Sequence, residues 1–177
     1  MVEPLLHFAV PFAALTALGI KPKRAFLLSL FALLPDLDIL INIHRFCSHS
    51  LIPLLAITIP LILIAVKFNF QRTLSLAIFA YVSHLFLDLF TGYTPILWPL
   101  YSQDLWINLN LFAHLASTPT YTLQATIQTQ PTTFTKFTNL DAPLFTSTGI
   151  AISTLLIAPT TIKAIIITIR RKIVCKK

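Results

Sequence analysis

Four short stretches of the chain hold four of its five histidines and three of its six acidic residues. These stretches are His7, Pro35-Asp36-Leu37-Asp38, residues 44–50 and residues 83–91. Imidazoles and carboxylates are the groups that bind zinc in proteins, and manganese and iron also accept them. The residue types therefore predict either a metal site or a set of buried ion pairs.

The spacing of these residues allows them to converge. His84, Asp88 and Thr91 lie four and three positions apart, so a helix would place them on one face. Pro35 disfavours regular helix beside it, which lets both carboxylates of the next stretch turn toward one cavity. The predicted metal ligands are His7, Asp36, Asp38, His44, His49, His84 and Asp88. Seven ligands exceed the four that one zinc ion needs, so we expect two or more ions with a bridging water as nucleophile.

Other residues near these stretches receive supporting roles. Arg45 can clamp a phosphate or carboxylate in a bidentate manner, and with Asp38 and Asp88 it forms the predicted catalytic set. Ser50 and Thr91 are expected to support the ligands. Simpler interpretations stay open: packing for a lone histidine, helix capping for the paired aspartates, and a helix-locking pair for His–x₃–Asp. Cys47 is a further alternative ligand. Glu3, Asp104 and Asp141 are expected to be solvated outer charges, and His114 is expected to be interfacial.

Composition indicates the environment of these groups. Hydrophobic residues make up 56% of the 177 residues, against about 45–50% in soluble domains, and charged residues make up 11%, against about 25%. These values exclude a disordered chain and a coiled coil and favour an integral membrane protein. The net charge of +7 does not indicate nucleic-acid binding, because the basic residues cluster between apolar runs, as they do in membrane proteins. The two cysteines build no disulfide framework.

Five apolar runs predict the elements that carry the site. They cover residues 5–20, 25–43, 51–66, 74–90 and 144–169. We expect an all-α, polytopic helical bundle of about five transmembrane helices. An outer N-terminus and an inner C-terminus place 11 of the 13 basic residues on the inner side. This topology puts the site in the extracytoplasmic half of the plasma or inner membrane.

The same topology divides the chain into three parts. Residues 1–100 form the membrane-embedded core with the predicted site. Residues 101–143 form an extracytoplasmic segment, in which 103–116 is interfacial and 117–138 is a Thr- and Pro-rich extended or irregular loop. Residues 144–177 form the last transmembrane helix and a basic cytoplasmic tail.

The ordered motifs of the first 100 residues resemble a known family. His7, Pro35-Asp36-Leu37-Asp38, His44-Arg45 with His49-Ser50, His84-x₃-Asp88-x₂-Thr91 and Leu97-Trp98-Pro99 are similar to the YdjM-like family of membrane-bound, presumed metal-dependent hydrolases. That family is distantly similar to zinc-dependent phospholipases C. The resemblance implies phosphoester chemistry by analogy.

Three functions follow from these observations. The first is a metal-dependent hydrolase acting on a lipid or small membrane-associated ester or phosphoester, with zinc preferred and manganese or iron as alternatives. The second is a metal or proton transporter that uses the same polar groups; no internal repeat supports it. The third is a membrane scaffold whose His–Asp pairs lock helices together. The lipid bilayer is the expected partner in each case, and no nucleic acid is expected.

Overall fold

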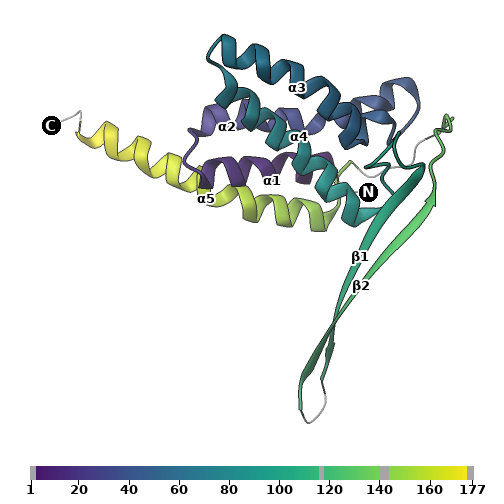
Figure 1. Ribbon diagram of the computed structural model, residues 1–177. Helices are drawn as coiled ribbons and strands as arrows, with labels where there is room; N and C mark the ends of the chain where they lie inside the picture. The colour runs from purple at the N-terminus through teal and green to yellow at the C-terminus, as the bar shows by residue number, and fades with distance from the viewer. Residues whose placement is uncertain (1–2, 116–117, 140–143, 175–177) are drawn as a thin grey trace.

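The computed structural model describes residues 3–115, 118–139 and 144–174. Helices pack side by side, and a long β-hairpin projects away from them (Figure 1). The elements are α1 (Pro4–Ala17), α2 (Pro22–Ser29), three 3₁₀ helices η1 (Leu30–Leu33), η2 (Pro35–Ile41) and η3 (Cys47–His49), α3 (Leu51–Lys67), α4 (Gln71–Thr91), β1 (Gln103–His114), β2 (Thr120–Pro131) and α5 (Ser147–Val174).

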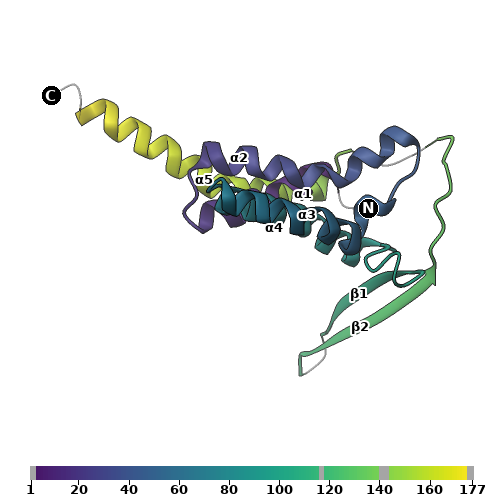
Figure 2. The ribbon, with the colours of Figure 1, turned by 45° about the horizontal axis from the view of Figure 1, so that its top comes forward.

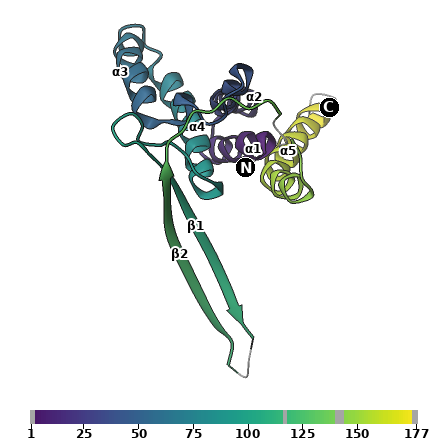
Figure 3. The same cartoon turned by 90° about the vertical axis from the view of Figure 1, so that its right-hand side faces the viewer.

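Helix α4 is central to the helical part. Figure 3 shows it between α3 and α1, and α1 in turn lies between α4 and α5. Among the residues whose side chains the structure describes, which leave out 164–165 and 167–174 of α5, α4 is the one helix that is long and apolar enough to cross a bilayer. Its 21 residues span about 30 Å at 1.5 Å per residue, the thickness of the hydrocarbon core.

The expected bundle of about five transmembrane helices is therefore wrong. Helix α1 has 14 residues and α3 has 17, so both are shorter than the ~20 that a membrane span needs. The orientation with the N-terminus outside depended on five alternating spans, and so did the extracytoplasmic placement of the site. Because the part of the chain that the structure describes does not have five such spans, neither the orientation nor the extracytoplasmic placement of the site is supported.

The second apolar run gives the clearest departure from the expected spans. Regular helix stops at Ser29, and the chain continues as the 3₁₀ helices η1 and η2. Pro35 has no backbone N–H and cannot continue an α-helix, so the chain turns tightly at this point. Asn42, with φ of 58°, ends η2 in the left-handed region. The eight residues of α2 reach only about 12 Å.

The segment expected to be interfacial and loop-like is also different. Strands β1 and β2 pair antiparallel over their whole length, from Gln103 opposite Pro131 to His114 opposite Thr120. Alternation of apolar and polar residues along β1 is the pattern of a strand, and the threonines of β2 are β-branched, which favours extended backbone. The Thr-rich composition of residues 117–138 predicted an extended or irregular loop, whereas residues 120–131 form a paired strand. Asp141 lies outside the described residues.

The C-terminal apolar run forms α5, as a helix of 28 residues that contains Pro159. Its first half lies against α1, and its second half extends beyond the other helices (Figure 2). The basic tail residues Lys176 and Lys177 lie outside the described part of the chain.

A small apolar core fixes the helices that carry the site. Phe12 and Leu15 of α1, Ala25 and Leu28 of α2 and Ala77 of α4 are buried together. The alanines let the backbones of α2 and α4 come close to α1. This packing holds α1, α2 and α4 together, and η2 contacts α4.

Candidate metal centre

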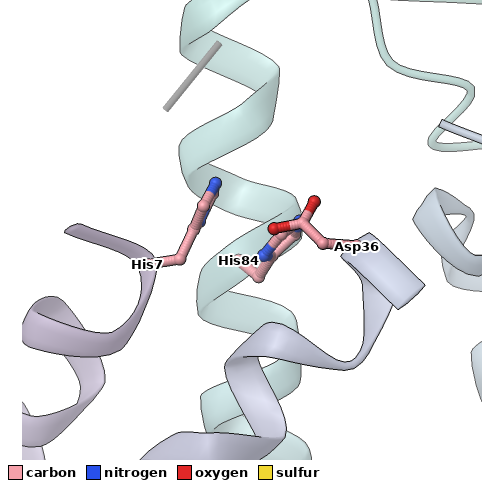
Figure 4. Close-up of side chains that lie close together, drawn as sticks. All are labelled: His7, Asp36 and His84. Atoms are coloured by element: carbon pink, nitrogen blue, oxygen red, sulfur yellow. The ribbon is translucent and has the colours of Figure 1, made fainter. Parts of the chain in front are cut away.

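Residues from four elements meet at one end of the helices. His7 comes from α1, Asp36 and Asp38 from η2, His49 from η3, and His84 and Asp88 from α4. His44 and Arg45 lie in the turn between η2 and η3. Figure 4 shows His7, Asp36 and His84 approaching one another from α1, η2 and α4. The structure therefore brings together all seven of the predicted ligands.

Four atoms form the centre of this group. The Nε2 atoms of His49 and His84 are 3.1 Å apart. Asp36 Oδ1 lies 3.6 Å from each of these nitrogens. Asp88 Oδ2 lies 3.3 Å from the His49 nitrogen and 3.5 Å from the His84 nitrogen. His49 and His84 are fully buried, and Asp88 is 2% exposed.

These distances suit a tetrahedral metal ion. Zinc binds histidine nitrogen and carboxylate oxygen at about 2.0–2.2 Å, so neighbouring ligand atoms of a tetrahedral site lie about 3.3–3.6 Å apart. The five distances above range from 3.1 to 3.6 Å. Asp88 Oδ2, which faces both histidines, is buried and has no hydrogen-bond partner. The cluster therefore contains a buried carboxylate oxygen that no hydrogen bond within the protein satisfies and that is available to a metal ion.

Two neighbours hold the other oxygen of Asp88. Arg45 Nη2 donates to Asp88 Oδ1 at 3.1 Å, and His7 Nε2 lies 3.5 Å from the same oxygen. The His7 ring stacks on the His84 ring with centroids 3.7 Å apart. These contacts direct Oδ2 of Asp88 toward His49 and His84. His7 also belongs to a possible ligand group with Asp36 and His84.

Asp38 orients His49. Its Oδ2 lies 3.1 Å from His49 Nδ1 and accepts hydrogen bonds from the Phe46 backbone N–H at 2.9 Å and from the Ser48 hydroxyl at 3.1 Å. A carboxylate on one ring nitrogen fixes the tautomer that leaves the other nitrogen free to bind a metal. His49 Nε2, the nitrogen that faces the cluster, would then be the atom available to a metal ion.

Electrostatics support this pairing. Burial alone would raise the pKa of Asp38, but the neighbouring imidazoles of His44 and His49 outweigh it and hold that pKa well below its usual value. Burial alone would lower the pKa of His49, but the neighbouring carboxylates of Asp36 and Asp38 outweigh it and raise that pKa. Without a metal, the two side chains therefore favour a charged pair.

His44 lies at the edge of the cluster. Its Nδ1 is 3.6 Å from Asp38 Oδ1, and neither of its ring nitrogens has a hydrogen-bond partner. It forms a possible ligand group with Asp36 and His49. These free nitrogens keep His44 among the predicted ligands.

The two predicted supporting hydroxyls contact the main chain. Ser50 donates to the carbonyls of Ile96 and Trp98, and Thr91 donates to the carbonyl of Asp88. Their contacts are therefore structural, at a loop junction and within α4. Cys47, the alternative ligand, lines a neighbouring apolar groove, and His114 is exposed on β1.

Sequence reasoning missed three contributors. Ser48 contacts both Asp38 and His49, and the Tyr81 hydroxyl donates to the Ser48 carbonyl at 2.5 Å. Gly92 gives room to Arg45, since a Cβ atom there would lie 2.7 Å from Arg45 Nη1. Ser48 lies inside the His-rich stretch, which was the available signal. No feature of the sequence around Tyr81 or Gly92 indicates that these residues contribute to the site.

Comparison with known proteins identifies one family. The family model described as "YdjM inner membrane protein" matches residues 2–170, which is nearly the whole chain. No curated protein and no solved structure matches.

Proposed function

Because the chain belongs to the YdjM inner membrane protein family, we propose that its buried His–Asp cluster is the metal centre of a hydrolase acting on membrane-lipid esters. The observation that carries this proposal is that the facing Nε2 atoms of His49 and His84 both lie within 3.6 Å of a carboxylate oxygen of Asp36 and of one of Asp88. Mixed nitrogen and oxygen ligands favour zinc, and manganese and iron are the alternatives to test.

The ligand set can hold more than one ion. Asp36, His49, His84 and Asp88 would hold the first. His7 and His44 extend the cluster on its two sides, each in its own possible ligand group. When bound, divalent metal at this centre supplies Lewis-acid polarisation of the scissile ester and a nucleophilic water at neutral pH.

The surrounding residues prepare these ligands. Asp38 holds the His49 ring through Nδ1, and Arg45 holds Asp88 through Oδ1. Arg45 Nη1 donates to the Tyr93 carbonyl at 2.6 Å, while its buried Nε has no partner. Because Nη1 and Nη2 each carry a second N–H, Arg45 would keep donors for a substrate oxygen. A guanidinium beside the site stabilises negative charge that develops on a phosphate or acyl oxygen.

Membrane lipids are the proposed source of the substrate. The chain belongs to an inner membrane family, and α4 is long and apolar enough to cross the bilayer. His84 and Asp88 lie in the last two turns of that helix. An ester group at the boundary between hydrocarbon and headgroups would therefore lie at the depth of the cluster.

The test combines metal analysis with a substrate screen. Purified protein is analysed for bound metal and then assayed with phospholipids and lipid phosphates in the presence of zinc or manganese. We expect a stoichiometric divalent metal and turnover that Asp88→Asn abolishes. Bound metal without turnover on any such ester would favour transport, which liposome flux measurements would reveal. Protein that binds no metal would favour a scaffold held by His–Asp pairs.

A further inference from the structure

An apolar groove of about 410 Å³ lies between α3 and α4 beside the cluster. Its walls include Phe31 of η1, Ile57 and Leu61 of α3, and Ile78 of α4. The volume is within the range of about 300–1,000 Å³ that is typical of small-ligand sites. None of the seven predicted metal ligands lines this groove.

One end of the groove is polar and adjoins the cluster. Cys47, Ser48 and Tyr81 line this end. The Ser48 hydroxyl donates to Asp38 Oδ2 at 3.1 Å and lies 3.2 Å from His49 Nδ1. The groove therefore ends one hydrogen bond away from the residue that orients the ligand His49.

The open side of the groove suits hydrocarbon. Ile57 is 63% exposed and Leu61 is 40% exposed, and exposed leucines and isoleucines continue along α3. Helix α3 packs along α4, the helix that can cross the bilayer. With α4 in the bilayer, the open side of the groove would face lipid acyl chains. The groove would offer one of these chains an apolar channel that leads to its polar end.

We infer that this groove binds one acyl chain of a membrane lipid and presents the attached ester or phosphoester to the cluster at Ser48. This inference rests on the proposed function and gives its substrate class. The substrate carries a long aliphatic chain, and a water-soluble ester with the same headgroup lacks the part that the groove binds.

Cys47 provides a direct measurement of occupancy, because it lines the groove and one substitution, Cys175→Ser, leaves it as the sole cysteine. The protein is transferred from detergent into amphipol, and alkylation of Cys47 by N-ethylmaleimide is followed by mass spectrometry. We expect myristoyl lysophosphatidylglycerol to slow alkylation several-fold. Glycerophosphoglycerol, the same headgroup without a chain, should leave the rate unchanged.

A matched pair of variants locates the chain. Ile57 and Ile59 are both on α3 and are 63% and 57% exposed, but only Ile57 lines the groove. Ile57→Trp should fill the groove and remove the lipid-dependent slowing of alkylation. Ile59→Trp should retain it. Each variant is compared as the ratio of rates with and without the lysolipid, so any shielding of Cys47 by the new indole itself cancels.

The same samples separate this inference from the proposed function. Bound metal without lipid protection of Cys47 would overturn the acyl-chain groove and leave the metal centre. Lipid protection without bound metal would keep the groove and overturn the metal centre. Equal protection in the two tryptophan variants would place the lipid elsewhere and overturn the inference.

Discussion

His49 and His84 face each other through their Nε2 atoms, 3.1 Å apart and 35 positions apart in the chain. Asp38 occupies the other nitrogen of His49, so the Nε2 of a neutral His49 presents a lone pair to His84. Two buried imidazoles in this arrangement need a shared proton or a cation between them. The carboxylates of Asp36 and Asp88 beside both nitrogens favour a cation.

Substitution of either histidine should remove metal. We expect His49→Gln and His84→Gln to lose most of the metal that the wild-type protein retains, because each removes one of four ligand atoms while filling much of the buried space. Elemental analysis after dialysis against a weak chelator measures this. His114→Gln is the matched control, since His114 is exposed on β1, and it should keep wild-type metal content. Equal metal in all three variants would contradict a centre at these histidines.

Asp38→Asn should weaken metal binding without removing a ligand from the central four. An amide cannot replace the negative charge that accepts from His49 Nδ1, Phe46 N–H and Ser48 together. Loss of such an orienting partner typically costs about 10–100-fold in metal affinity. Competition with a chelator measures the affinity. Asp104→Asn, which changes an aspartate that is 9% exposed and bonded to Thr132 in the hairpin region, should leave it unchanged.

Gly92→Ala should disturb Arg45. Its Cβ would lie 2.7 Å from Arg45 Nη1, which is held by the Tyr93 carbonyl and cannot move without releasing that bond. The backbone at Gly92 is extended, so the cost is one of contact rather than of backbone conformation. We expect weaker metal binding through Asp88 and slower turnover. Arg45→Lys should give the same two effects, because a single ammonium nitrogen cannot occupy the two positions from which Nη1 and Nη2 contact the Tyr93 carbonyl and Asp88. Full metal affinity in Arg45→Lys would instead favour a role of Arg45 on substrate alone.

The stability of the metal-free protein should depend on pH through His49 and Asp38. The raised pKa of His49 gives a stabilising contribution that is present below its unfolded value of 6.5 and is lost as pH rises through the folded value. The lowered pKa of Asp38 gives a contribution that is present above 3.8 and is lost as pH falls below it. Stability from this pair should therefore be greatest between about pH 4 and 6.5. Thermal melts of chelator-treated protein should show a loss of stability as pH rises above about 6.5, and Asp38→Asn should reduce this loss. A rise over that range would contradict the charged pair.

Shortening the hairpin should leave the metal centre intact. All seven predicted ligands precede β1, and Asn108 lies opposite Thr126 in the register. Replacing residues 109–125 by Asn-Gly would close the hairpin with a tight turn and keep its base, including the bridge between Thr94 and Leu105. Elemental analysis should give wild-type metal content. Loss of metal with unchanged helical content would show that the distal hairpin supports the centre.

The sequence alone determined which residues are chemically unusual. Histidines and aspartates in an apolar chain must find partners, and their order along residues 7–88 identified the family that the match over residues 2–170 confirms. The spacing of His84 and Asp88 placed both on one helical face, as α4 shows. These conclusions rest on helical periodicity and on the free-energy cost of burying charge. Both can be inferred from residues that are close together in the sequence.

Tertiary structure decided the rest. Hydropathy counts apolar residues but does not say whether they form one long helix, so residues 25–43 predicted a span where Pro35 instead starts the 3₁₀ helix η2. The strand pairing of residues 103–131 depends on partners up to 28 positions apart. The division of roles between Asp36, which faces Nε2 of His49, and Asp38, which faces its Nδ1, depends on the path of η2 and η3 through space. Two carboxylates separated by one residue are equivalent in sequence, and only their contacts distinguish Asp36, the proposed ligand, from Asp38, the proposed orienting group.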